Sequence, residues 1–237
     1  GEDLESFMDE INWAYPQLNL TLSDVTMWNA GLVPFGENEP GSENLSYGKR
    51  SHIIDHQQTD NLQGLVTLIG VRYTMGRSDS AKAVDLIQQK LGQPVRPAPT
   101  DYQPVYGGNF KKFEDLVLQI EDQFNHCLDA DVNQAIAHNY GNEYGTLNTL
   151  VQENPELGKL IEGSTIVRAE VIHAIRNEMA LKLSDIVFRR TDLATGKHPG
   201  MNALKECAAL ASSELNWSEE QCEAELQSTL QCFPDFK

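Results

Sequence analysis

The sequence predicts an α+β fold that is mainly α, with a small antiparallel sheet followed by a C-terminal helical domain. Two short apolar, β-branched runs lie before residue 71 and are typical of strands. A proline-rich segment, residues 92–99, separates them from the rest. Beyond it, apolar residues recur at helical spacing almost to the end of the chain.

The N-terminal part begins with a predicted helix. Residues 3–15 place apolar side chains on one side of a helix, and Pro16 ends it. Residues 25–35 are expected to be extended, as a first strand. Residues 36–46, rich in Gly, Asn, Glu and Pro, are expected to form a polar loop.

Two strands and a helix are expected next. The strands lie near residues 50–56 and 65–70, the second of them buried, and the helix covers residues 80–91. A strand that ends at a glycine and leads through a polar turn into a helix leaves free backbone N–H groups at the positive end of the helix dipole. This place suits an anion or a polarised carbonyl oxygen.

The proline-rich segment predicts a domain boundary. Its prolines, Pro94, Pro97 and Pro99, remove N–H donors and fix φ, so the segment cannot form a helix or a central strand. A chain of 237 residues is long enough for two domains. We therefore expect domains at residues 1–95 and 96–237.

The second domain is expected to consist of helices. They are predicted at residues 113–124, 132–140, 146–152, 165–183, 184–191, 201–215 and 218–231. Val171, Ile175, Met179 and Leu183 recur every four residues, which predicts one stripe facing a core. Ser184 is the expected N-cap where this long helical segment breaks.

Charge and composition exclude several classes of partner. The formal net charge is -17, with a pI of about 4.6, so phosphate backbones and anionic lipid are repelled by the average surface. No nucleic acid is expected as a partner. No apolar run is long enough to span a bilayer, and residues 1–20 are acidic and do not form an export signal. We expect a soluble, cytoplasmic protein.

The histidines and cysteines do not predict a metal site. His52 and His56 would meet on a helix, but on a strand they are roughly 13 Å apart at about 3.3 Å per residue. The intervening Ile53 and Ile54 favour a strand. None of the four cysteines forms a C-x-x-C pair.

Motifs for nucleotide binding and hydrolysis are absent from the sequence. There is no G-x-G-x-x-G and no G-x-x-x-x-G-K-[ST]. Residues 76–80 lack the second glycine of a nucleophile elbow, so a hydrolase has no support. Tyr106-Gly107-Gly108-Asn109 is expected to be only a turn.

A small cluster of basic residues is the strongest candidate for a binding site. The sequence has only 18 Lys and Arg residues, and four of them are Lys49, Arg50, Arg72 and Arg77. If the two strands are neighbours, these side chains converge near the turn, where guanidinium groups suit phosphate or carboxylate. Solvated arginines at strand ends explain the spacing equally well.

The amino-acid sequence of this region resembles that of a known family. Gly70-Val71-Arg72-Tyr73-Thr74-Met75-Gly76-Arg77, followed by an Ala-rich helix, is similar to the G-G-K-[LWY]-T-T-x-R segment of FAD-dependent glycerol-3-phosphate dehydrogenases. The resemblance extends over most of the chain. It includes Ala30-Gly31-Leu32-Val33-Pro34-Phe35, Glu39-Pro40-Gly41-Ser42, Arg50-Ser51-His52-Ile53-Ile54, Tyr140-Gly141 and residues 171–193.

The resemblance implies a C-terminal portion of such a flavoprotein. Residues 1–95 would then be the end of its FAD-dependent oxidoreductase domain, and the partner would be the N-terminal half that carries most of the FAD site. It also implies that the turn lies beside the flavin ring, where reduction leaves negative charge that a cation and a helix N-terminus stabilise. The implied cofactor-binding residues are Gly70, Val71, Arg72, Tyr73 and Thr74.

The same resemblance implies the substrate site and shows where this chain departs from the pattern. Arg50 and Arg77 are the substrate-binding candidates, Arg50 for the substrate phosphate. Arg72 replaces the family lysine, and Met75 replaces the second threonine. Val33 stands where the family has a phosphate-binding arginine, so another small hydroxy substrate stays open.

The expected function is therefore that of a parent enzyme. It would oxidise sn-glycerol 3-phosphate to dihydroxyacetone phosphate through FAD and pass electrons to a quinone or another acceptor. This portion alone is expected to be inactive, and contact with the inner membrane, if any, is expected to be peripheral. The alternative is a non-enzymatic helical module, residues 100–237, that binds a partner protein.

Overall fold

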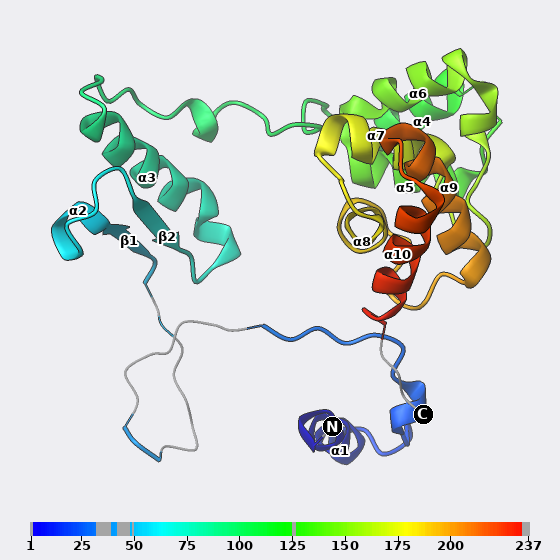
Figure 1. Cartoon of the computed structure of the whole chain (residues 1–237), viewed down its shortest axis with the longest axis horizontal. Helices are drawn as coiled ribbons and strands as arrows, with labels where there is room; N and C mark the ends of the chain where they lie inside the picture. Colours follow the sequence, from blue (N-terminus) through cyan, green and yellow to red (C-terminus); the bar gives the residue numbers. More distant parts are fainter. Residues whose placement is uncertain (1, 32–38, 42–47, 49, 125–126, 234–237) are drawn as a thin grey trace. The chain divides into compact units, whose positions relative to one another are not determined.

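The structure, a computed structural model, describes residues 2–31, 39–41, 48, 50–124 and 127–233. Over these residues it is mainly helical with a small two-stranded antiparallel sheet, which confirms the predicted fold class (Figure 1). The chain divides into two compact units. We call Ala30–Val105 the sheet unit, and Gly1–Asn29 with Tyr106–Lys237 the helical unit. The predicted domains 1–95 and 96–237 stay a prediction.

The sheet unit contains both strands expected near residues 50–70. Strand β1 is His52–Asp55, and strand β2 is Val66–Ile69. They pair antiparallel, with His52 opposite Ile69 and Asp55 opposite Val66. Between them lies the short helix α2, His56–Thr59, whose N-cap is Asp55. The β-branched runs therefore form strands as predicted, each shorter than expected at its ends.

The helix of the sheet unit begins earlier than predicted. A 3₁₀ turn, Tyr73–Met75, leads directly into helix α3, Gly76–Lys90, so the expected start at residue 80 is wrong. Gly76 already has helical φ and ψ angles. The turn after β2 thus ends at residue 75, and Arg77 lies in the first turn of α3 rather than in a loop.

The second strand is not buried as expected. Val66 and Thr67 are half-buried, but Leu68 and Ile69 are exposed. The physical reason is that the sheet has only two strands among the described residues, with α3 against β2 and the short α2 against β1. Of the described residues of the sheet unit, only Asp79 and Ala83 are buried.

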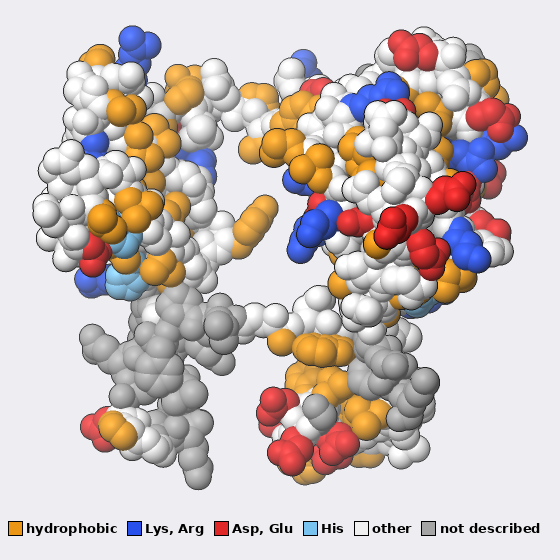
Figure 2. All heavy atoms as spheres, in the orientation of Figure 1, with side chains coloured by type: hydrophobic (Ala, Val, Ile, Leu, Met, Phe, Trp, Pro, Cys, Tyr) orange, Lys and Arg blue, Asp and Glu red, His pale blue; other side chains and the backbone are white. Residues whose placement is uncertain are grey.

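Apolar side chains are therefore exposed at several places on the sheet unit's surface (Figure 2). The large exposed ones on β2, on α3 and beside them are Leu62, Leu65, Leu68, Ile69, Val84, Ile87 and Leu91. Contiguous exposed apolar side chains are typical of interaction sites, ligand-binding grooves and aggregation-prone surfaces.

The helical unit contains the remaining helices. They are α1 Glu2–Ala14, α4 Phe113–Gln123, α5 Ala130–Tyr140, α6 Tyr144–Glu153, α7 Arg168–Glu178, α8 Leu183–Asp185, α9 Met201–Leu215 and α10 Glu219–Leu230. The predicted helices are thus confirmed at most positions. In contrast to the sheet unit, the helices after residue 112 enclose well-packed apolar cores.

Two clusters of buried side chains hold these helices together. One is built from α4, α5, α6 and part of α7, and includes Ile120, Ile136 and Leu147. The other is built from α7 to α10 and includes Leu183 and Leu204. Each fully buried aliphatic side chain contributes roughly 1.5–3 kcal/mol, so the helical unit has a stabilising core of its own.

The long helix predicted over residues 165–183 is wrong at both ends. Helix α7 covers only Arg168–Glu178, because Met179 takes a left-handed conformation with φ of 58° and ends it. Met179 is 81% exposed, so the expected stripe from Val171 to Leu183 does not face one core. The next helix, α8, has Lys182 rather than Ser184 as its N-cap.

The segment after α8 is also irregular. Residues Ile186–Arg190 form a π-helix instead of the α-helix expected over 184–191. Thr191 closes it, because its Oγ1 donates to the carbonyl oxygen of Ile186 at 2.7 Å.

The predicted turn at Tyr106–Asn109 is confirmed, and it docks on the 3₁₀ turn Gly141–Glu143 that precedes α6. The amide of Asn142 donates to the carbonyl oxygen of Gly107 at 3.0 Å, and that of Asn109 donates to Oδ1 of Asn142 at 2.9 Å. Gly141, with φ of 54°, lies so close that a Cβ there would be 1.8 Å from the carbonyl oxygen of Gly107. Glycine is therefore required at position 141.

The segment expected as a first strand, residues 25–35, is only partly described. Residues 25–31 belong to no strand, so that expectation is wrong for them; Thr26 instead donates its hydroxyl to the carbonyl oxygen of Gly196 at 2.6 Å. Residues 32–35, most of the predicted loop 36–46, and the positions Val33 and Lys49 lie outside the described residues. Among the described helices, none is long and apolar enough to cross a membrane.

Candidate functional site

The pairing of β1 and β2 brings the predicted site residues to one end of the sheet. Because His52 lies opposite Ile69, Arg50 just before β1 and residues 70–74 just after β2 leave the sheet at the same end. Helix α3 begins there too, two residues after Thr74. We call this place the cationic end, defined by Arg50, residues 70–74 and Arg77.

The arginines of the cationic end are available to bind an anion. Arg50, Arg72 and Arg77 are exposed. None of the hydrogen bonds or ion pairs of the described residues involves their guanidinium groups. The first backbone N–H groups of α3 add the positive end of a helix dipole of fifteen residues. Such a set of donors suits phosphate, carboxylate or a ring edge that becomes negatively charged.

The turn between β2 and α3 presents an aromatic side chain. Tyr73 is 102% exposed, and Gly70, Arg72 and Thr74 are exposed beside it, whereas Val71 is half-buried. A fully exposed tyrosine on a short 3₁₀ turn contributes nothing to the core of the sheet unit. Its surface is therefore open to a flat ring, and an Arg72 charge stands next to it in the chain.

One polar pair near this end was not found from the sequence. Ser51 donates its hydroxyl to Oδ2 of Asp79 at 2.5 Å, and Oδ1 of Asp79 lies 3.6 Å from Nζ of Lys82. Asp79 is 5% exposed. Hydrophobic periodicity does not reveal such a residue. Once the start of α3 is known, however, an aspartate three residues later is expected to interact with the helix N-terminus.

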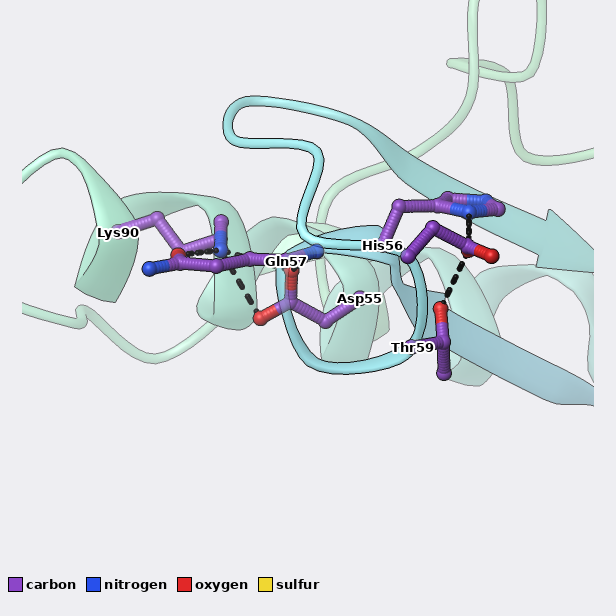
Figure 3. Close-up of polar contacts among 6 residues, drawn as sticks. Asp55, His56, Gln57, Thr59 and Lys90 are labelled. Carbon is purple, nitrogen blue, oxygen red and sulfur yellow. Dashed lines mark hydrogen bonds and ion pairs between the residues drawn. The ribbon is translucent and has the colours of Figure 1, made fainter.

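The opposite end of the sheet unit is closed by polar contacts (Figure 3). Nζ of Lys90, the last residue of α3, donates to Oδ1 of Asp55 at 2.7 Å and to Oε1 of Gln57 at 2.8 Å. The hydrogen bond from Lys90 lowers the pKa of Asp55. These contacts fasten the end of β1 and the start of α2 to the end of α3.

The two histidines considered for a metal site lie in different elements and do not share a site. His52 begins β1 and is exposed, while His56 begins α2. The Nδ1 of His56 lies 2.6 Å from Oδ2 of Asp60, and its Nε2 lies 2.9 Å from Oγ1 of Thr67 (Figure 3 shows the first contact). Both ring nitrogens of His56 are thus occupied by protein partners. Over the described residues no group of three or more His, Cys, Asp or Glu side chains is arranged to hold a metal ion.

The helical unit contains a second polar group, buried in its core. Glu170 is 1% exposed and His173 is 0% exposed, both on α7. Oε1 of Glu170 accepts from the amide of Val167 at 2.8 Å, but among the described residues its Oε2 and both ring nitrogens of His173 have no hydrogen-bond partner. Nε2 of His173 lies 3.8 Å from Oε1 of Glu178, at ion-pair distance only. The ring of Tyr140 packs edge-on against His173, with centroids 5.3 Å apart.

Burial shifts the ionisation of these groups toward their neutral forms. Burial raises the pKa of Glu170 to about 7, an effect that the Val167 amide and the Tyr140 hydroxyl offset only in part. Burial also lowers the pKa of His173, against the nearby charges of Glu178 and Glu143. This group could not be predicted from periodicity, because a glutamate and a histidine in an amphipathic helix are expected on its polar face.

Comparison with known proteins gives consistent matches. Residues 98–222 match the family model of the C-terminal domain of alpha-glycerophosphate oxidase. The chain is 30% identical to a glycerol-3-phosphate dehydrogenase of Synechocystis, over 99% of this chain and 43% of the relative. It is 28% identical to a probable mitochondrial glycerol-3-phosphate dehydrogenase of Dictyostelium discoideum, over 96% of this chain and 36% of the relative. The chain thus spans less than half the length of these relatives.

A solved structure has a similar fold. The glycerol-3-phosphate dehydrogenase from Bacillus halodurans, solved in complex with FAD, superposes with a TM-score of 0.72 at 18% identity. The match covers 98% of this chain and 44% of that one. At this identity the likeness concerns the fold alone.

Proposed function

Because this chain belongs to the family of the C-terminal domain of alpha-glycerophosphate oxidase, we propose that it is the C-terminal part of a flavoprotein that oxidises sn-glycerol 3-phosphate to dihydroxyacetone phosphate. The parent protein passes the electrons to a quinone or another acceptor. The observation that carries this proposal is the cationic end, where Arg50, residues 70–74 and the start of α3 meet.

The residues at the cationic end fit FAD and a phosphate-bearing substrate. FAD, when bound, would supply the two-electron acceptor for oxidation of the substrate carbinol to the ketone. Arg72 and the first N–H groups of α3 would stabilise the negative charge that reduction places on the flavin, and the exposed ring of Tyr73 would be available to contact it. Arg50 and Arg77 bind the substrate phosphate as forked donors. Gly70 and Val71 let the backbone of the turn approach the cofactor.

The partner of this chain is the N-terminal half of the same flavoprotein. The exposed apolar side chains of β2 and α3 support this, because a unit with only Asp79 and Ala83 buried among its described residues needs another surface to cover them. The chain alone is then inactive, since most of the FAD site lies in that half. Any membrane contact of the parent protein is peripheral.

Flavin bleaching tests the proposed function. The complete protein encoded by the gene should be yellow when purified, and anaerobic addition of sn-glycerol 3-phosphate should bleach its flavin absorbance. Glycerol without the phosphate is the control, because Arg50 and Arg77 then have no anion to bind. A colourless complete protein, or one bleached equally by glycerol, would contradict the proposal.

A divergent substrate is the second candidate, and Val33 at the position of a family arginine favours it. A family member with one phosphate ligand fewer accepts a small hydroxy compound with a different anionic group. The same bleaching assay with sn-glycerol 3-phosphate and with small 2-hydroxy carboxylates separates the two candidates.

Removal of the Arg72 charge should make the flavin harder to reduce. In the complete protein, Arg72→Ala is expected to lower the flavin reduction potential by roughly 30 mV, which equals about 1.4 kcal/mol for a two-electron couple. The rate of flavin reduction should fall by about tenfold or more, because a charge beside the developing anion is lost. Potentiometric titration and stopped-flow absorbance measure the two effects.

Arg96→Ala is the matched control for that experiment. Arg96 is also an exposed arginine, but it lies in the proline-rich segment away from the turn in sequence. Its removal should leave the reduction potential unchanged. An unchanged potential in Arg72→Ala would refute the role of Arg72.

A further inference from the structure

Asp79 is an unusual residue for the interior of the sheet unit. It is 5% exposed, in a unit where Ala83 is the only other buried residue among those described. A carboxylate in such a place needs hydrogen bonds or a counter-charge. Asp79 has the hydroxyl of Ser51 at 2.5 Å and the ammonium of Lys82 at 3.6 Å.

The hydrogen bond from Ser51 connects two elements that carry the cationic end. Ser51 directly follows Arg50 and precedes β1, whereas Asp79 lies in the first turn of α3, two residues after Arg77. Helix α3 packs on β2. The Ser51 contact therefore adds a side-chain link between the start of β1 and the start of α3, which holds the backbone at Arg50 beside the helix.

Electrostatics make this link useful. Arg77 stands at the positive end of the α3 dipole, where a cation is unfavourable. Arg50 and Arg72 leave the sheet at the same end, so their charges repel one another and Arg77. The Asp79 carboxylate places negative charge in this first turn. This negative charge reduces the repulsion among the three arginines, so they can lie close together before an anion binds.

We infer that Asp79, acting through the hydroxyl of Ser51, is a positioning residue that holds Arg50 at the cationic end for a phosphate group. The inference rests on the proposed function only for the identity of the phosphate-bearing substrate. Neither Ser51 nor Asp79 touches the anion; each acts through the placement of Arg50.

Binding of inorganic phosphate by the complete protein tests the inference directly. Isothermal titration calorimetry should show that Ser51→Ala weakens phosphate binding by about tenfold, the effect of losing one hydrogen bond to a charged group. Arg50→Ala should weaken it at least as much. Ser51→Thr retains the hydroxyl and should bind phosphate like the wild type. Such a rescue would show that the weaker binding in Ser51→Ala comes from the lost hydroxyl and not from general destabilisation.

Two further variants separate charge from hydrogen bonding and test specificity. Asp79→Asn keeps an acceptor for Ser51 but removes the charge, so an intermediate loss of phosphate affinity is expected. Ser80→Ala, an exposed serine of the same helix, should change nothing. If Asp79→Asn fails to fold, Ser51→Ala still decides the question, since it removes only one half-buried hydroxyl.

Steady-state kinetics distinguish the inference from the proposed function. With sn-glycerol 3-phosphate, Ser51→Ala should raise KM about tenfold and leave kcat nearly unchanged. Unaltered phosphate affinity in Ser51→Ala, or no phosphate binding by the wild type, overturns the inference. A complete protein that does not oxidise sn-glycerol 3-phosphate, yet loses phosphate affinity on Ser51→Ala and regains it in Ser51→Thr, overturns the proposed function and supports the inference.

Discussion

Gly141→Ala should destabilise the helical unit by roughly 3 kcal/mol or more, because two separate penalties act at this position. An alanine Cβ would lie 1.8 Å from the carbonyl oxygen of Gly107, far inside the closest approach of two non-bonded atoms. The φ of 54° with ψ of -135° is also a conformation that residues with a side chain rarely adopt. The turn at Gly107 must therefore separate from the 3₁₀ turn Gly141–Glu143.

Urea denaturation followed by circular dichroism at 222 nm measures this loss. Since the amide of Asn142 donates to the same carbonyl oxygen of Gly107, that hydrogen bond is lost with the turn. We expect amide hydrogen exchange at Asn142 and Asn109 to accelerate in the variant. Exchange in α9 should change less, because Leu204 and Cys207 of that helix lie in the other buried cluster, built from α7 to α10.

Gly145→Ala provides the matched control. Gly145 lies in α6, four residues after Gly141, has open space at its Cβ position and has no positive φ. Alanine there should stabilise the chain by about 0.5–1 kcal/mol, because it favours the helix more than glycine does. Equal effects of the two substitutions would show that the Gly107 contact is not formed.

Glu170→Gln should remove a pH dependence from the stability of the helical unit. Burial raises the pKa of Glu170 from 4.5 to about 7, so the folded chain holds a proton that the unfolded chain releases between those pH values. The stability contributed by this proton is fully present below about pH 4.5 and is lost as the pH rises to 7. At about 1.4 kcal/mol per pKa unit, the wild type should lose about 3 kcal/mol across this window relative to Glu170→Gln.

The comparison with the variant is necessary because His173 acts in the opposite direction. Burial lowers the pKa of His173, so its contribution to stability is lost as the pH falls through its folded-state pKa. Tyr140, Glu178 and Asp192 also face Glu170. Since these groups are present in both proteins, the difference between wild type and variant isolates Glu170.

The measurement is a series of urea denaturation curves from pH 4.5 to pH 8 for both proteins. Glu153→Gln serves as the control, because Glu153 is exposed at the end of α6 and its substitution should leave the wild-type slope in place. If the free energy of unfolding depends on pH in the same way for wild type and Glu170→Gln, Glu170 is ionised in the folded chain at all these pH values.

Sequence patterns correctly predicted the elements that are determined by local features, such as β-branched runs and helical spacing of apolar residues. The β-branched pairs of β1 and β2 formed strands, and α9 formed over the residues that its apolar spacing indicated. The end of α7 could not be predicted in this way. Its last turn is closed by Met179 in a left-handed conformation, where a sequence argument expects glycine or asparagine.

The candidate site could be predicted only in part. Arg50 and Arg72 lie at the same end of the sheet only if the two strands pair. The sequence could not establish that pairing, and the register of β1 and β2 shows it. Ser51 and Asp79 were missed, because their contact spans 28 residues and depends on a helix that starts earlier than its apolar pattern suggests. The roles of residues 70–74, Arg50 and Arg77 stay predictions.

The open sheet of Ala30–Val105 bears on how this chain behaves during synthesis and in the laboratory. Both strands have one unpaired edge among the described residues, and apolar side chains lie next to them. In a ribosome-bound or recombinant chain that lacks a covering surface, such edges invite pairing with other copies, chaperone binding and proteolysis. Studies of the well-packed helices must therefore keep residues 1–29 together with residues 106–237, because both segments belong to the helical unit.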